Sequence, residues 1–568
     1  MRQRIADRKA LFFSIFFTGF ISCIYAPFEL YALNTQDLWF TLTNFWYIPL
    51  ACGAFAMIAA AVPGLFLGGT LLKLYTGMIL GFGICIYVQG NFLNLKLGQM
   101  TGSVIDWTQY RGRMILNLLL WIIIICVTTA LCVWGGKKKP GIVSKTISGV
   151  SLFITAMLLV TLTVLIVPCL QQENEKRPEE GYPTNKDLLS LSPSGNVVVL
   201  VLDTYDINYF RQALQEVPEF EEQLDGFIWF DNFTGCYPRT SFAIPFMLSG
   251  NYCKQGDPYK QVGIDSAERL YLDELSENGY DTSFYTQYNL VPDRARKNAV
   301  NYVNADCVIS DRKAFTFSLY SLVICKYFPD ICKPAAWLSP DDFEARRRLD
   351  SDYRIYATNN LTLVDHLDQQ EMTADADRPQ FKFIHVDGAH LPSNIDEWGH
   401  RTEDSSQIEE IPVKGSLRLA LRYLEEMKSL NVYDNSAIII TADHGVNTRD
   451  GDWYESFNSP VFLVKPAGAK GALTVNHTPC SQSDLGATIL ELAGIDTESS
   501  YGVSVFDETG AREKKRYYYK LDQTGSTISG EAINKLTEYE IDPEGNSPDH
   551  FHPTGVEYGS NDEETAKQ

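Results

Sequence analysis

Five long apolar stretches in the first 170 residues constrain the fold of this chain more than any other feature of its sequence. Crossing a bilayer takes roughly 20 apolar residues as a helix. One such stretch could be a buried helix of a soluble domain, but five separated by short loops predict a membrane domain over residues 1–170. No small-residue cleavage site follows the first stretch, which argues against a cleaved signal peptide. The stretches are residues 10–31, 45–67, 71–93, 113–135 and 147–170.

The basic residues predict how these spans are oriented. The N-terminal sequence "MRQRIADRK" and the loop "GGKKKPGIVSK", at residues 135–145, are both rich in Lys and Arg. Positive loops remain on the cytoplasmic side of a membrane. With five spans, these two segments fall on the same side. We therefore expect a multi-pass cell-membrane protein with a cytoplasmic N-terminus and an extracytoplasmic chain after residue 170.

The rest of the chain has a different composition. Residues 171–568 are mixed and acidic, and they carry most of the net charge of −22. An acidic domain without a basic stripe cannot neutralise phosphates along a nucleic acid, which excludes that partner. Residues 171–195 are polar and rich in Pro and Glu, as in a linker. Residues 506–568 are again polar and acidic, and we expect a C-terminal extension that ends in a disordered tail.

Between linker and tail, residues 196–505 have the pattern of an α/β domain. The segments "NVVVLVLDTYD" at 196–206, "RPQFKFIHVDGAH" and "DNSAIIITADHG" each contain a continuous apolar run. Such runs are typical of strands buried on both faces, as in a parallel sheet. Helical patterns come between them, notably at 415–432. The predicted fold is a five-helix transmembrane bundle followed by an α/β domain with a mostly parallel central sheet.

Acidic and histidine side chains stand at the ends of these strands, where α/β sheets bind ligands. One Asp after a strand is usually a turn former or helix cap, and one His is usually structural. Two carboxylates and an imidazole at two strand ends instead favour a divalent metal site, with Zn²⁺ or Mn²⁺ as the ion that accepts mixed oxygen and nitrogen ligands. The residues are Asp203, His385, His390, Asp443 and His444.

Four segments carry a resemblance to a known family. "NVVVLVLDTYD", "TSFAIPFMLSG", "FIHVDGAHLP" and "VYDNSAIIITADHG" resemble, in that order, the sulfatase-like branch of the alkaline phosphatase superfamily. With the five spans, the chain is similar to membrane-anchored lipoteichoic acid synthases and phosphoethanolamine transferases. The resemblance implies a metal held by Asp203, Thr240, Asp443 and His444. Those transferases usually carry Glu in place of Asp203, and sulfatases usually carry a second Asp in place of Thr204.

The segment "GCYPRTSFAIPFMLSG" offers two candidate nucleophiles. In sulfatases a Cys, oxidised to formylglycine, is followed by Arg four residues later and by a terminal Gly ten residues later. Here Arg239 follows Cys236 by three residues, and Thr240 is the residue ten before Gly250. Thr240 also begins a helical pattern, where backbone N–H groups and the helix dipole attract an anion. Thr240 is therefore the predicted nucleophile, although it could also be a helix cap alone.

The cysteines after residue 170 predict disulfide bonds. They are even in number, which in an oxidising compartment suggests pairing. Cys236 with Cys253 is the preferred pair, and Cys325 with Cys332 is close enough in sequence to bridge a short loop. The six are Cys236, Cys253, Cys307, Cys325, Cys332 and Cys480.

The function these residues predict is a two-step phosphotransfer. Thr240 attacks a phosphodiester, a phospho-threonine forms, and an acceptor hydroxyl then takes the group. By resemblance His390 could protonate the leaving group, while Arg239, His385 and His477 are candidates for binding the substrate.

The membrane spans favour a phospholipid donor in the bilayer, carrying phosphoglycerol or phosphoethanolamine, and a surface glycan or glycolipid as acceptor. One alternative is a membrane-anchored phosphodiesterase or sulfatase-like hydrolase that uses water as the acceptor. The other is a catalytically inactive lipid-binding sensor.

Overall fold

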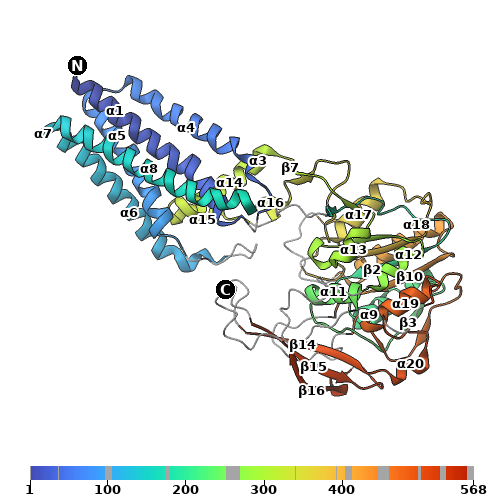
Figure 1. Ribbon diagram of the computed structural model, residues 1–568. Helices are drawn as coiled ribbons and strands as arrows, with labels where there is room; N and C mark the ends of the chain where they lie inside the picture. The colour runs from blue at the N-terminus through green and yellow to red at the C-terminus, as the bar shows by residue number, and fades with distance from the viewer. Residues whose placement is uncertain are drawn as a thin grey trace. The chain divides into compact units, whose positions relative to one another are not determined.

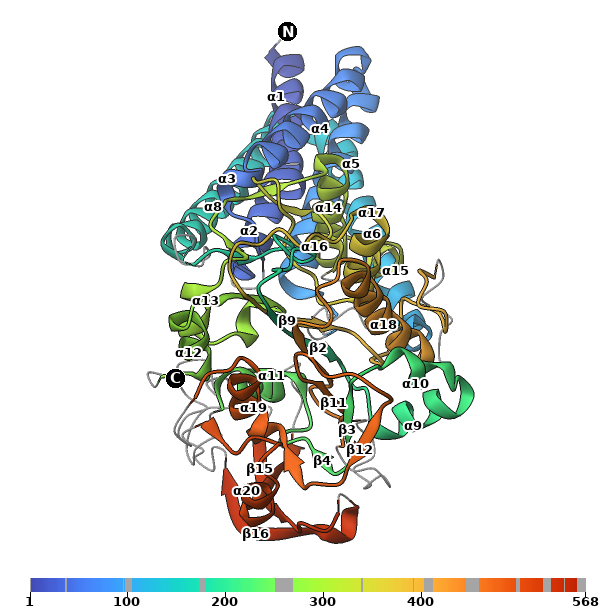
Figure 2. The ribbon, with the colours of Figure 1, turned by 90° about the vertical axis from the view of Figure 1, so that its right-hand side faces the viewer.

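The computed structural model divides the chain into two units, each of which is compact by itself (Figures 1 and 2). The helical unit comprises Met1–Pro178 and Ala305–Asp350, and the α/β unit comprises Glu179–Asn304 and Ser351–Gln568. The structure describes residues 2–35, 38–95, 97, 105–172, 180–250, 269–338, 341–391, 393–402, 412–445, 459–496, 501–524, 533–545 and 547–558.

Among the described residues of the helical unit, five helices are long and apolar enough to cross a membrane, which confirms the prediction of five spans. The first and the fourth each contain a short π-helical stretch. The spans run Gln3–Leu33, Leu42–Phe66, Gly69–Phe92, Trp107–Lys138 and Gly141–Leu170. Their main helices are α1 (Arg2–Gly19), α2 (Ala26–Leu33), α3 (Leu42–Phe45), α4 (Tyr47–Phe66), α5 (Gly69–Phe92), α6 (Arg111–Ala130), α7 (Gly136–Lys138) and α8 (Pro140–Gln172).

Small residues bring two of these spans together. A Cβ atom added to Gly77 of α5 would lie 2.6 Å from the Cα atom of Thr129 in α6, and one added to Gly81 would lie 2.9 Å from the Cα atom of Ile125. Helices in a bilayer associate through such close backbone packing, because lipid supplies no hydrophobic driving force between them. The outward side chains of the spans are large and apolar and are exposed, as expected for helices that face lipid.

Residues 305–350 complete the helical unit, although they lie within the part of the sequence predicted to be the outer domain. Strands β7 and β8 pair antiparallel at the base of this segment, and α14 is its longest helix. Its elements are β7 (Cys307–Ile309), α14 (Arg312–Tyr327), η7 (Asp330–Cys332), α15 (Lys333–Ala336), α16 (Asp341–Glu344) and β8 (Arg347–Leu349).

The α/β unit is built on a seven-stranded sheet, which confirms the predicted α/β fold with a mostly parallel sheet. The strand order is β12-β3-β11-β10-β2-β9-β5, and β10, β2, β9 and β5 are parallel neighbours. The strand β11 is antiparallel to both β10 and β3. The strands are β2 (Asn196–Leu202), β3 (Ile228–Phe230), β5 (Asp281–Tyr285), β9 (Gln380–Val386), β10 (Ser436–Thr441), β11 (Phe462–Lys465) and β12 (Thr474–Asn476).

Alternate residues of β2 enter two separate cores, because side chains alternate across a sheet. Val198 and Leu200 lie in the core with helices α9, α10, α17 and α18, whereas Val197 and Val199 lie in the core with α11, α12, α13 and α19. The sheet is therefore the middle layer of three. The helices are α9 (Ile207–Glu216), α10 (Glu219–Gln223), α11 (Thr240–Ser249), α12 (Tyr271–Glu277), α13 (Asp293–Asn298), α17 (Asn360–Gln369), α18 (Val413–Ser429) and α19 (Leu485–Leu492).

The C-terminal region contains a second sheet that its polar composition did not indicate. Three antiparallel strands, β14 (Arg516–Thr524), β15 (Ile533–Ile541) and β16 (Phe551–Tyr558), follow α20 (Glu508–Glu513). Tyr519 stacks on Tyr237, and its backbone N–H donates a hydrogen bond to the carbonyl of Cys236 at 2.9 Å. The extension thus packs against the loop before α11. The disordered tail expected at its end falls on residues 559–568, which lie outside the described residues.

The predicted disulfide bonds are not supported. Cys325 and Cys332 are both free, because the Sγ atom of Cys325 in α14 points to the carbonyl of Ala336, 3.1 Å away. Cys236 is a free and fully buried thiol. Its predicted partner, Cys253, lies outside the described residues. The pairing prediction was wrong at Cys325 and Cys332 because closeness in sequence does not fix the direction of the side chains.

Candidate metal and catalytic site

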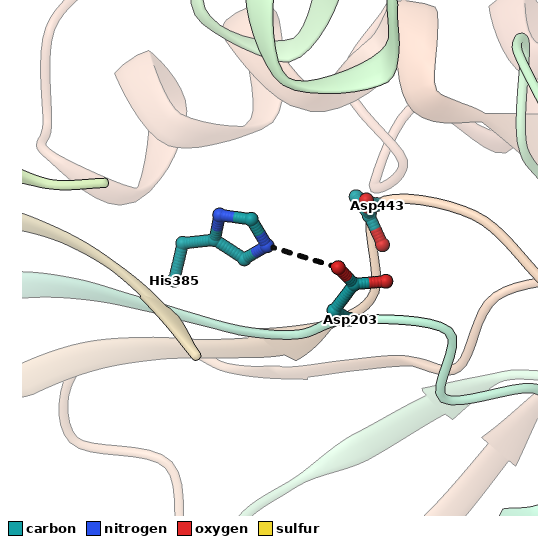
Figure 3. A group of neighbouring side chains, drawn as sticks. All are labelled: Asp203, His385 and Asp443. Carbon is teal, nitrogen blue, oxygen red and sulfur yellow. Dashed lines mark ion pairs between the residues drawn. The ribbon is translucent and has the colours of Figure 1, made fainter. Parts of the chain in front are cut away.

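Three central strands bring the candidate ligands together at the carboxyl ends of the strands of the main sheet. Asp203 follows β2, His385 lies near the end of β9, and Asp443 follows β10. Because these strands are parallel neighbours, their carboxyl ends meet. One ligand atom from each of the three residues lies within 4.8 Å of the other two, and all three residues are buried (Figure 3).

A strained turn after β2 sets the direction of the two carboxylates. Thr204 has a φ of 62°, a left-handed conformation that is uncommon outside glycine and costly for a β-branched residue. Its backbone N–H donates to the Oδ1 atom of Asp443 at 3.2 Å, and its hydroxyl donates to the Oδ1 atom of Asp203 at 2.6 Å. The strained residue therefore contacts both carboxylates at once.

A glycine allows the loop after β9 to approach this turn. Gly388 has a φ of 55°, and a Cβ atom there would lie 2.6 Å from the backbone nitrogen of Asp203. No larger residue fits without moving the turn. The same loop carries Asp387, whose pKa is raised to about 6 by burial and by the negative charge of Asp203.

Hydrogen bonds fix the rings of the two histidines. The Nδ1 atom of His385 lies 3.0 Å from the hydroxyl of Thr286, and its Nε2 atom lies 3.7 Å from Asp203. The Nδ1 atom of His444 lies 2.7 Å from the carbonyl of Gly445, which can only accept a hydrogen bond. The neutral His444 ring therefore presents an Nε2 lone pair to the site, 3.7 Å from Asp203 and 3.5 Å from Asp443.

Two buried atoms in this cluster have no hydrogen-bond partner among the described residues: Nε2 of His385 and Oδ2 of Asp443. Buried polar atoms are seldom left without a partner in proteins. Both belong to side-chain types that ligate metals, and they lie beside a second carboxylate, Asp203. This set of oxygen and nitrogen donors fits a divalent cation.

The electrostatics of the cluster agree with that fit. Burial raises the pKa of Asp443, and the negative charge of Asp203 raises it further. Burial also opposes ionisation of Asp203, but the nearby imidazoles of His385 and His444 outweigh it and lower the pKa of Asp203. The pKa of His385 is raised because Asp203 and Asp443 outweigh the effect of its burial. Two carboxylates this close favour a bound positive charge.

Thr240 faces this cluster from the first residue of α11, as the sequence predicted for the start of the helix. Its Oγ1 atom lies 3.3 Å from the Oδ2 atom of Asp203 and 3.3 Å from the Nε2 atom of His444. Arg239, at the helix N-cap, is exposed. A hydroxyl, a cationic side chain and free backbone N–H groups at a helix N-terminus are a suitable surround for a phosphoryl group.

Cys236 lies in a different environment from Thr240. It belongs to an apolar cluster with Tyr237, Phe246 and Tyr519, and its backbone N–H donates to Gln482 at 2.8 Å. Burial raises the pKa of its thiol to about 12. A neutral, enclosed thiol is a structural cysteine rather than a reactive one.

The remaining predicted residues are more distant from the cluster or are exposed. His390 is exposed in the turn after β9, where its backbone N–H donates to the carbonyl of Asp387 at 2.8 Å. His477 is paired with Asp231 at 2.8 Å, and its side chain is 75% exposed. It follows β12, which β3 and β11 separate from β10. The structure does not bring His477 to the other candidates.

Two residues that support the site were missed. Thr286, which orients His385, follows β5, so the rule of polar residues at strand ends could have found it. The side-chain amide of Gln482 donates to the carbonyl of Asp443, and its oxygen accepts from Cys236. Gln482 therefore ties the loop before Thr240 to the turn that carries Asp443, and no sequence pattern indicates this role.

The fold and the site define a sulfatase-like hydrolase or transferase, joined to a five-span membrane unit. The Sulfatase family model matches residues 195–495 of the 568. The chain therefore belongs to the sulfatase family. This match includes Asp203, Thr240, His385 and Asp443.

Curated relatives match a shorter stretch. The lipoteichoic acid synthases of Staphylococcus aureus strains USA300 and MRSA252 are each 28% identical over 176 residues, which is 26% of this chain and 27% of the relative. The match thus spans about a quarter of the length of these relatives.

Solved structures with similarity to the chain have low sequence identity. A protein in the alkaline phosphatase superfamily from Vibrio parahaemolyticus has 13% identity and a TM-score of 0.40, covering 68% of this chain and 85% of its own. PsFucS1 sulfatase from Pseudoalteromonas sp. has 13% identity and a TM-score of 0.38, covering 61% and 83%.

Proposed function

We propose that the protein is a metal-dependent phosphotransferase that moves a phospholipid headgroup to a cell-surface glycan or glycolipid through a phosphorylated Thr240. The observation that carries this proposal is the place of the Thr240 hydroxyl, 3.3 Å from both Asp203 and His444 at the start of α11. The lipoteichoic acid synthase relatives support a lipid donor and a glycolipid acceptor.

The reaction has two balanced steps. In the first, the Thr240 oxygen loses its proton and bonds to the phosphorus of the donor phosphodiester, while the bond from phosphorus to the lipid alcohol breaks. The lipid alcohol leaves with a proton, and the headgroup phosphate is held on Thr240 as a diester. In the second, the acceptor hydroxyl bonds to phosphorus and Thr240 regains its proton. Phosphorus keeps its oxidation state throughout.

The chain supplies the groups that this reaction needs. His444 presents an Nε2 lone pair that can bind the ion, and the exposed His390 could protonate the leaving lipid alcohol. Arg239 and the N-terminus of α11 would hold phosphate oxygens. The protein would bind Zn²⁺ or Mn²⁺ through Asp203, Asp443, His444 and Thr240, with His385 as an added candidate ligand. Such an ion would neutralise phosphoryl charge and lower the pKa of the Thr240 hydroxyl.

The orientation of the chain belongs to the same proposal. Lipid donors and surface acceptors would meet the α/β unit on the extracytoplasmic side, as the basic segments at the N-terminus and residues 135–145 predict. Substrate binding by His477 has no support in this arrangement, because β3 and β11 lie between its strand and β10.

Labelled phospholipid tests the proposed intermediate. Protein in liposomes with phospholipid labelled in the headgroup is quenched, digested and analysed by mass spectrometry, and the added mass should lie on Thr240 and identify the headgroup. Thr240→Ala should lose the label and turnover. Ser241→Ala is the matched control, since Ser241 is the next residue on the same helix and is exposed. Label on another residue, or turnover by Thr240→Ala at the wild-type rate, would overturn the mechanism.

Hydrolysis is the second candidate reaction, because the chain belongs to the sulfatase family. Analysis of the reaction products distinguishes it from transfer. A transferase accumulates headgroup phosphate on the glycan or glycolipid, whereas a hydrolase releases it to water at the same rate with or without acceptor. Cys236→Ser distinguishes a formylglycine sulfatase, because that enzyme would lose all activity without Cys236. We expect Cys236→Ser to remain active.

A further inference from the structure

Residues 305–350, here called the anchor segment, are inserted in the sequence of the α/β unit but belong to the helical unit. The chain passes to the helical unit after Asn304 and returns at Ser351. In both views of Figures 1 and 2 the yellow-green helix α14 lies among the blue and teal spans. We propose that the anchor segment docks on the ends of the spans at the depth of the membrane and so forms a second, non-covalent attachment of the α/β unit to the membrane.

The depth of α14 follows from one hydrogen bond. The hydroxyl of Tyr320 donates to the carbonyl of Cys23 at 2.8 Å. Cys23 lies ten residues, or about 15 Å, before the end of the first span at Leu33. That 31-residue span is about 46 Å long, roughly 16 Å more than the hydrocarbon core of a bilayer. Even if all of the excess length of the span projects beyond the bilayer at the Leu33 end, Cys23 and the Tyr320 hydroxyl bonded to it lie at about the boundary of the hydrocarbon core.

Shape complementarity at α5 supports the docking. A Cβ atom on Gly90 would lie 2.2 Å from the ring of Tyr327, so this ring occupies the space that a side chain in the span would take. Tyr327 is 1% exposed and belongs to one apolar cluster with Phe17, Ile86 and Trp121 of the spans. The last turn of α14 is thus packed like the interior of the bundle.

Polar side chains in the spans find their partners in the anchor segment. Gln89 of α5 donates to the carboxylate of Asp330 at 3.1 Å, and the backbone N–H of Asp330 donates to Asn117 of α6 at 3.0 Å. Lys333 and Arg113 lie 3.3 Å and 3.6 Å from the same carboxylate. Gln89 and Asp330 are both fully buried. Asn117 also donates to Gln89 at 2.7 Å within the spans, so the anchor segment completes a polar network in a region that offers little water.

A buried ion pair makes a second polar connection. The Nζ atom of Lys326 in α14 lies 2.6 Å from the Oε1 atom of Glu29 in α2. Glu29 is 8% exposed, and ionisable residues within spans pair with one another when they persist at all. Lys326 supplies the partner of Glu29, so the anchor segment satisfies charges in two different spans.

The outward side of the anchor segment is suited to lipid. Phe317 of α14 is 69% exposed and Ile331 is 49% exposed, comparable with Phe92 at 71% and Leu33 at 54% on the ends of the spans where α14 docks. An exposed apolar surface that continues the lipid-facing surface of the spans takes the bilayer as its occupant.

Cutting the chain between the two units tests the attachment. A protease site placed in residues 173–179 of the full-length protein, in native membranes, leaves residues 180–568 with no covalent link to the spans. After cleavage and a high-salt wash, we expect most of this fragment to sediment with the membranes. Release of the wild-type fragment into the supernatant would overturn the proposal.

Two sets of variants test whether the spans hold the fragment. Gly90→Val should release it, because the new side chain displaces Tyr327. Gly149→Val is the matched control, since nothing lies within 4 Å of a Cβ atom at Gly149 in α8. Lys326→Glu should also release the fragment, and adding Glu29→Lys should restore retention. If Gly90→Val does not fold, the exchange of charges between Lys326 and Glu29 still tests whether the spans hold the fragment. Retention of the fragment in all of these variants would overturn docking on the spans.

Photo-crosslinking tests the lipid contact independently of cleavage. Benzoylphenylalanine at Phe317 in the intact protein should form adducts with lipid acyl chains that mass spectrometry detects. The same probe at Tyr353, an exposed residue of the α/β unit just after the anchor segment, is the control. Equal lipid adducts at both positions, or none at Phe317, would overturn a membrane depth for α14.

Discussion

Asp330 in the helical unit and Asp443 in the α/β unit are both fully buried carboxylates, yet their surroundings are opposite. Asp330 has two cations within 3.6 Å, Lys333 and Arg113, together with the amide of Gln89. Asp443 has a second carboxylate, Asp203, beside it, and no Lys or Arg side chain among the described residues pairs with it. The comparison teaches that a buried carboxylate with its charge already balanced holds a structure together, whereas one facing a like charge is suited to binding a cation.

Asp443→Asn should have the largest effect, and that effect should be on activity and metal binding. The substitution removes a negative charge and a ligand atom, and a bound ion supplies several kcal/mol of transition-state stabilisation. We expect turnover of a phosphodiester to fall by about 10³-fold or more and the metal content of the purified protein to fall with it. With EDTA present in both samples, the thermal stability of the α/β unit should be no lower in Asp443→Asn than in the wild type, because repulsion from Asp203 is relieved. A variant that loses stability but keeps its metal would remove the contrast with Asp330.

Asp330→Asn should behave in the opposite way. It leaves Lys333, which is 1% exposed, without the carboxylate that balances its charge. Breaking a buried ion pair by removing one partner costs about 3–5 kcal/mol. The melting temperature of the detergent-solubilised protein should fall, while turnover of a water-soluble phosphodiester per folded molecule should stay at the wild-type level. Asp496→Asn, at an exposed carboxylate, is the control and should leave both measurements unchanged.

Removal of the metal by a chelator tests directly whether Asp443 binds an ion that stabilises the α/β unit. An ion bound only to the folded state stabilises it by about 2.7 kcal/mol at 100 times its dissociation constant. EDTA should therefore lower the melting temperature of the wild-type α/β unit, and added Zn²⁺ or Mn²⁺ should restore it. In Asp443→Asn, EDTA should produce little or no shift. An equal shift in wild type and Asp443→Asn would place the stabilising ion elsewhere.

Lys382 on β9 of the α/β unit is a buried basic side chain, in contrast to the two buried carboxylates. Its substitution should give the smallest change in stability. Burial lowers its pKa to about 7 despite the charges of Asp187 and Asp281. Between about pH 7 and pH 10 the unfolded chain binds the Lys382 proton and the folded chain does not. Stability should therefore rise with pH in this window, by up to about 1.4 kcal/mol per pH unit.

Lys382→Met should remove that contribution. Chemical denaturation at pH 7.5 and pH 8.5 measures the difference, and the substitution should flatten the slope by about 1 kcal/mol per pH unit. Lys470→Met, at an exposed lysine, is the control. A slope in Lys382→Met equal to that of the wild type would show that Lys382 stays protonated in the folded state.

The sequence predicted the α/β unit better in its sheet than at its margins. Continuous apolar runs ending in Asp203 and Asp443 identified two strands and their shared edge, because a short run of this kind is typical of a parallel strand buried on both faces. The same reasoning placed His385 and His390 at the strand ends with Asp203 and Asp443, but it could not decide which of the two histidines meets the carboxylates, since the last residues of a strand give no sign of which face they occupy until the register is known. The C-terminal sheet was missed because its two outer strands are short of continuous apolar runs and one, β16, is mostly exposed.

In the helical unit, the sequence predicted the spans but not the segment that packs against them. The hydropathy of its five spans is sufficient to predict them, but the anchor segment has the composition of an ordinary amphipathic helix and is separated from the spans by more than a hundred residues. Nothing in the local sequence indicates that Tyr327 packs on Gly90 or that Asp330 bonds to Gln89. Both contacts depend on how the spans pack together, which leaves space beside Gly90 and a donor on Gln89.

The place of the anchor segment in the chain also dictates an order of biosynthesis. The last span ends by Gln172, and the segment that satisfies Gln89, Asn117 and Glu29 is complete only at Asp350. A ribosome adding about 5–20 residues per second takes about 10–35 s to synthesise the intervening stretch. During that time the inserted spans hold polar groups without their final partners. Assembly of the bundle therefore waits for translocation of the first part of the α/β unit, Glu179–Asn304, and insertion and export of this chain are steps of a single folding reaction.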